Sequence, residues 1–62
     1  IATGRVGVQV ANNLAALAIR RGDRAAAESL YRSALTLAGN APGLEADRRA
    51  VQSNLDALAA AR

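Results

Sequence analysis

The chain has 62 residues, a formal net charge of +3 at pH 7, and neither Cys nor His. A chain of this length forms at most one small domain (residues 1–62), which buries only about 60% of the surface that the unfolded form exposes. Disulfide bonds are excluded, and neither a metal site nor a cofactor is expected, because the usual nitrogen and sulfur ligands are missing.

Alanine supplies 17 of the 62 residues, and because alanine has the highest helix propensity, the composition predicts an all-α fold. The first helix is expected over residues 6–21, where apolar residues recur at steps of three and four. This apolar face consists of Val6, Val10, Leu14, Leu17 and Ala18. Gly22 is expected to end the helix in a left-handed conformation, and Asp23 to cap the start of the next helix.

Two further helices are expected, over residues 24–38 and 43–61, separated by the helix-breaking stretch "GNAPG" at residues 39–43. We expect the first two helices to be antiparallel and the third to pack beside the first. The apolar face of the third helix carries Leu44, Val51, Leu55 and Leu58. The predicted core consists of Leu14, Leu17, Leu30, Tyr31, Ala34 and Leu55.

A short internal repeat connects the first and third predicted helices. The stretches "NNLAALA" at residues 12–18 and "SNLDALA" at residues 53–59 share five of seven residues without a gap. Asn13 and Asn54, like every other matched pair, lie 41 residues apart. A period of about 40 residues with two helices per period indicates a helical solenoid, in which successive repeats stack on one another.

The same residues resemble a tetratricopeptide repeat (TPR), in particular the kinesin-light-chain type. Leu14-Ala15 is similar to the Leu-Gly pair of that family. Ala27, Tyr31 and Ala34 are similar to the small–aromatic–small spacing of its second helix. The resemblance implies an α-solenoid fragment with three antiparallel helices, a helical hairpin followed by the first helix of the next repeat.

The resemblance covers about residues 8–39 as one repeat and about residues 49–62 as part of a second. It departs from the family at Ala11 and Ala18, where aromatic residues are usual, and at Gly39, where proline is usual. The alternative is a generic Ala-rich bundle of three helices. The chain begins with Ile, and we expect it to be a piece of a longer or processed protein.

The resemblance implies a protein–protein interaction function. In the family, the first helices of successive repeats line a concave groove, where asparagines contact the backbone of an extended peptide. An amide suits this task because it donates and accepts hydrogen bonds at once. Asn13 and Asn54 are expected to form two rungs of such a ladder, although these amides have the alternative of binding a loop or solvent. The candidate groove residues are Gln9, Asn12, Asn13, Ala16, Ile19, Arg20 and Asn54.

The alternative function is structural self-association without a foreign peptide. One and a half repeats are fewer than the three that a solenoid usually needs, so part of the third helix is expected to leave an apolar patch. We expect this patch to join identical chains, most simply as a two-fold dimer. The candidate self-association residues are Leu44, Val51, Leu55, Leu58 and Ala59.

Other function classes are not favoured by the sequence. Enzyme catalysis is not expected, because the chain has no His or Cys and its serines have no adjacent base. Nucleic-acid binding is disfavoured by the modest charge and by the single aromatic residue, Tyr31. The longest apolar run has six residues, against about 20 for a membrane span, and a cytoplasmic location is the expectation. We expect solvent to surround three arginines near the first turn, Arg20, Arg21 and Arg24. The alternative is that they bind a carboxylate or a phosphate group.

Overall fold

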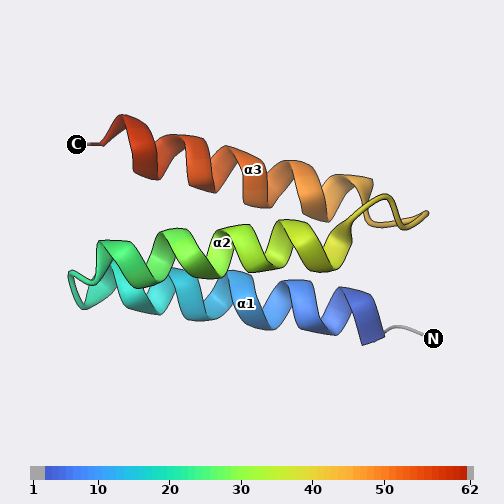
Figure 1. The fold of residues 1–62 in the computed structure, drawn as a ribbon, viewed down its shortest axis with the longest axis horizontal. Helices are drawn as coiled ribbons and strands as arrows, with labels where there is room; N and C mark the ends of the chain where they lie inside the picture. The colour runs from blue at the N-terminus through green and yellow to red at the C-terminus, as the bar shows by residue number, and fades with distance from the viewer. Residues whose placement is uncertain (1–2, 62) are drawn as a thin grey trace.

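The computed structural model describes residues 3–61, and this part of the chain folds into three α-helices without a strand (Figure 1). α1 spans Thr3–Arg20, α2 spans Arg24–Ala38 and α3 spans Glu45–Ala60. Successive helices are antiparallel, so α1 and α3 run in the same direction (Figure 1). The all-α prediction is confirmed, and the predicted helix ends differ from the observed ones by three residues at most.

The turn between α1 and α2 uses the residues that the sequence indicates. Gly22 has a φ of 78°, which residues with a side chain rarely adopt, and its N–H donates to the Ile19 carbonyl at 2.9 Å. The Asp23 carboxylate accepts the backbone N–H of Ala26 at 3.1 Å, as expected of an N-cap. Because this turn is so short, α2 folds back on α1 as its antiparallel neighbour.

The turn between α2 and α3 is held by side chains from the start of α3. The Gly39 N–H donates to the Leu35 carbonyl at 2.9 Å, which closes the end of α2. The Arg48 guanidinium donates to the Gly39 carbonyl at 3.2 Å, and the Glu45 carboxylate accepts the Gly43 N–H at 2.9 Å. These contacts fix the start of α3 close to the end of α2.

The interface between α1 and α2 is built mainly from small residues. Its buried side chains are Val8, Ala11, Ala15 and Ala18 on α1, and Ala27, Tyr31, Ala34 and Ala38 on α2. Alanine lets two helix backbones approach closely, and these two helices make the most extensive contact in the fold. Gly7 has the same effect near the start of α1, because a Cβ at this position would lie 3.3 Å from Cδ1 of Leu37.

Two residues that the sequence assigns to the core are exposed instead. Leu14 and Leu17 each keep 46% of their surface accessible. Of the other predicted core residues, Tyr31 and Ala34 are buried, and Leu30 and Leu55 are half-buried. Two faces of α1 show helical spacing, and the prediction selected the face with the larger side chains. The structure packs α2 on the alanine face, where close approach compensates for small side-chain size.

The third helix packs mainly against α2 and touches α1 only slightly. The expected packing of α3 beside α1 is therefore present only as a minor contact. Leu44 and Val51 are buried, and Leu55 and Leu58 are half-buried against the same core. The core therefore continues from the hairpin through α2 to α3.

Candidate protein-interaction surface

The two adjacent asparagines of α1 lie in different surroundings. Asn12 is half-buried, and its Oδ1 accepts a hydrogen bond from Nδ2 of Asn54 on α3 at 3.1 Å. Asn13, the next residue, is exposed. An amide can pair with another amide because each carries both a donor and an acceptor. The repeated asparagine of α3 therefore joins α3 to α1, and its partner is Asn12.

The predicted groove residues lie mostly in solvent. Asn12 and Asn54 are brought together, and the others are spread along the exposed part of α1. The exposed members are Gln9, Asn13, Ala16, Ile19 and Arg20 on α1, and Asn54 on α3. We define these residues together with Asn12 as the amide face. Because Asn54 already bonds Asn12, a peptide that binds Asn54 has to compete with this contact.

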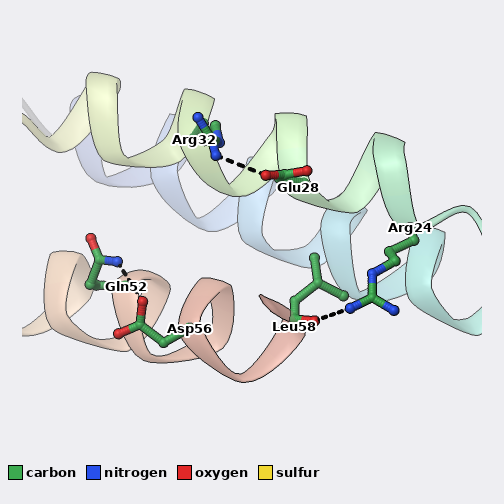
Figure 2. Close-up of polar contacts among 6 residues, drawn as sticks. All are labelled: Arg24, Glu28, Arg32, Gln52, Asp56 and Leu58. Atoms are coloured by element: carbon green, nitrogen blue, oxygen red, sulfur yellow. Dashed lines mark hydrogen bonds and ion pairs between the residues drawn. The ribbon is translucent and has the colours of Figure 1, made fainter. Parts of the chain in front are cut away.

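Two arginines hold α3 in place, one near each end. Arg5 of α1 donates to the Gly43 carbonyl at 3.0 Å, and its Nε lies 3.4 Å from Oδ2 of Asp47. Nη2 of Arg24, the first residue of α2, donates to the Leu58 carbonyl near the end of α3 (Figure 2). A cation at a helix C-terminus stabilises the helix dipole. The role of Arg5 could not be predicted from the sequence, because nothing near it in the sequence indicates a partner 38 residues away.

The most exposed apolar surface of the described residues lies on α1. We define the outer stripe as Val6, Val10, Leu14 and Leu17, each between 46% and 55% exposed. The steps of four, four and three residues place these side chains on one face of the helix. Single exposed apolar residues are normal, whereas a continuous stripe of them usually marks a contact surface.

The predicted self-association patch on α3 is largely covered within the chain. Leu44 and Val51 are buried, Leu55 and Leu58 are half-buried, and Ala59 is exposed. α2 covers part of this patch, because it packs against α3 with one side and against α1 with the other, and the open part consists of Leu55, Leu58 and Ala59. Self-association itself stays a prediction, and the larger apolar surface open to a partner is the outer stripe.

The charges are divided unequally between the helices. α1 carries Arg5 and Arg20 but no acidic residue, whereas α3 has Glu45 and Asp47 in its first turn. Acidic residues at a helix N-terminus stabilise the helix dipole.

Along residues 3–61 no group of three or more metal-ligating side chains is present. None of the helices in the same range has the length and apolar character that a bilayer span requires.

Comparisons with family models, with curated proteins and with solved structures found no match to this chain. The resemblance to tetratricopeptide repeats therefore rests on the residues quoted above.

Proposed function

We propose that this chain is a protein–protein interaction module of a TPR-like solenoid, which docks an extended peptide or a partner subunit on the amide face. The proposal is carried by the hydrogen bond between Asn12 and Asn54, at 3.1 Å. This bond aligns α1 and α3, two helices that share the repeated sequence and run in the same direction. Asn13 and Gln9 are exposed beside it and have amide groups that suit the backbone of an extended peptide.

The test is a selection of peptides from a random display library against the immobilised chain. Affinities of the selected peptides are then measured by fluorescence anisotropy. Asn13→Ala is expected to weaken binding about three- to tenfold, because one or two hydrogen bonds to the peptide are lost. Ser29→Ala, at an exposed position of α2, is the matched control and should leave the affinity unchanged. Failure to select any peptide, or equal binding by the Asn13→Ala variant, contradicts the proposal.

Self-association is the second candidate function, and an open hollow at one end of the molecule supports it. The hollow lies where α1 and α3 end, beside the first turn, and is lined by Ile19, Gly22, Arg24, Leu58 and Ala61. Leu58 belongs to the predicted self-association patch. Sedimentation equilibrium at micromolar concentration tests this candidate: it requires a dimer that Leu58→Glu converts to a monomer. A folded monomer in both cases rejects it.

A further inference from the structure

Two polar side-chain contacts join α1 to α3 among the described residues, and they share one register. Arg5 forms an ion pair with Asp47, and Asn12 accepts a hydrogen bond from Asn54. In both pairs the partners are 42 residues apart, and the two levels are separated along each helix by about two turns. Elsewhere the two helices touch only slightly. The amide pair is therefore the main link between α1 and α3 away from the end that Arg5 holds.

The next level of this register is open. It is formed by Ile19 and Ala61, which are also 42 residues apart and which both line the open hollow at the end of the molecule. Both residues are exposed. In Figure 1, α3 also diverges from α2 toward its C-terminal end. Within residues 3–61 the amide pair is thus the last polar contact that closes the surface between α1 and α3.

The amide pair is not needed to keep α3 in place. Val51 is buried in the core, and Leu55 packs against the same core. Near the two ends of α3, Arg5 donates to the Gly43 carbonyl and Arg24 to the Leu58 carbonyl. A hydrogen bond at a partly exposed site contributes little net stability. The amide pair can therefore open while the rest of α3 keeps its position.

Opening the pair requires the movement of one side chain, that of Asn54. Asn54 is exposed, whereas Asn12 is half-buried. Nδ2 of Asn54 donates to Asn12, so this donor is not available to a peptide. Rotation of an exposed side chain takes nanoseconds or less, and it frees the donor. Because Asn12 is only half-buried, its Oδ1 stays accessible to water after the bond breaks, which avoids the cost of a buried unpaired acceptor.

We propose that the hydrogen bond between Asn12 and Asn54 is an autoinhibitory latch of the amide face. The free chain has the latch closed in most molecules, and a peptide that uses Asn54 binds the open form. The apparent Kd then exceeds the intrinsic Kd by the reciprocal of the open fraction. This inference rests on the proposed peptide binding and adds regulation to it: Asn13 binds the peptide, and Asn12 restrains the binding.

The test uses selected peptides whose affinity for the chain falls with Asn54→Ala. Their Kd is measured by fluorescence anisotropy with the original chain and with the Asn12→Ala variant. Removal of the latch should lower the Kd about three- to sixfold, because one net hydrogen bond no longer has to be broken. The same variant should be slightly less stable in urea, whereas a merely structural role of Asn12 would lower stability and affinity together. An unchanged or higher Kd overturns the proposal, as does a selection in which no peptide depends on Asn54.

Two controls isolate the acceptor of Asn12. Asn12→Asp keeps an oxygen acceptor at the same position and so keeps the latch, and its Kd should be no lower than that of the original chain. In a chain that already carries Asn54→Ala, adding Asn12→Ala should leave the Kd unchanged, because no latch is left to open. A lower Kd for the Asp variant, or a gain that persists without Asn54, overturns the proposal.

A measurement on the free chain separates the latch from the peptide site. Hydrogen exchange of the Asn54 side-chain amide, followed by NMR, should be about three- to sixfold faster in Asn12→Ala than in the original chain. Equal exchange rates overturn the latch, whether or not a peptide binds. Weaker binding by Asn13→Ala without a gain from Asn12→Ala also overturns the latch, and it leaves the proposed function intact. A gain from Asn12→Ala with normal binding by Asn13→Ala supports the latch and contradicts the proposed role of Asn13.

Discussion

α1 and α3 share a sequence pattern but differ in surroundings, and the difference shows how neighbours determine burial. Val10 is 50% exposed and Val51, its counterpart 41 residues later, is 1% exposed. Both valines lie on the larger apolar face of their helix. The only relevant difference is that α2 packs on this face of α3 and on a different face of α1. A helical pattern therefore specifies which residues lie together and leaves open which of them a neighbour covers.

The faces that α2 contacts are also different in kind. On α1 it contacts the small residues Ala11, Ala15 and Ala18, whereas on α3 it contacts the larger Val51 and Leu55. The alanine contact allows close backbone approach and is the more extensive of the two. One helix, α2, can thus pack against two related helices that each present a different face to it. This arrangement lets helical repeats stack in one direction.

The largest effect on stability is expected from removing the side chain of Tyr31, which α2 contributes to the core. Tyr31 is 3% exposed, and Tyr31→Ala is expected to lower the free energy of unfolding by about 3–5 kcal/mol. A chain of this size is marginally stable, so the variant should be largely unfolded in the absence of urea. Urea titration followed by circular dichroism measures the change. Tyr31→Phe keeps the ring and is the control; an Ala variant as stable as the original chain would show that α2 does not hold the core.

A second experiment compares the alanine face of α1 with its counterpart in α3. Ala15→Leu inserts a larger side chain where 0% of the surface is exposed, and it should cost about 1–3 kcal/mol of stability. Asp56→Leu, 41 residues later, makes the same side chain at an exposed position and should leave stability nearly unchanged. Urea unfolding of both variants gives the comparison. Equal losses would mean that α2 does not distinguish the two faces.

A third experiment compares the valines themselves. Val51→Ala removes two buried methyl groups and should destabilise the chain by about 1.5 kcal/mol. Val10→Ala makes the same change at an exposed site and should stay within about 0.5 kcal/mol of the original chain. Both free energies come from urea unfolding. If the Val10 variant loses as much as the Val51 variant, the outer stripe is already covered in solution.

The smallest expected effect concerns the amide pair that links α1 to α3. A double-mutant cycle with Asn12→Ala and Asn54→Ala should give a coupling energy of about 0.5–1 kcal/mol, because a net hydrogen bond at a partly exposed site contributes little. The measurement uses the unfolding free energies of the original chain, both single variants and the double variant. Repeating the cycle with Asn13 in place of Asn12 is the control, and it should give no coupling. Additive losses for the first pair would argue against the link.

The candidate site could be predicted only in part. The repeat pattern matches Asn13 with Asn54, whereas in the structure Asn54 bonds to Asn12, so the ladder of Asn13 and Asn54 stays a prediction. The pattern did not indicate which asparagine of α1 would be the partner, because adjacent helix positions differ by about 100° in direction and the choice depends on where α3 lies. The contacts of Arg5 and Arg24 with α3 were missed for the same reason, since both partners are distant in the sequence.

The sequence by itself determined the three helices and the first turn. Alanine content, the steps of three and four residues, Gly22 and the Asp23 cap act within a few residues of one another, so no tertiary contact is needed to read them. Only the tertiary structure decided that Leu14 and Leu17 are exposed while Ala15 and Ala18 are buried. The physical reason is that α1 has two apolar faces of similar spacing, and the gain from close packing against α2 selects the smaller side chains.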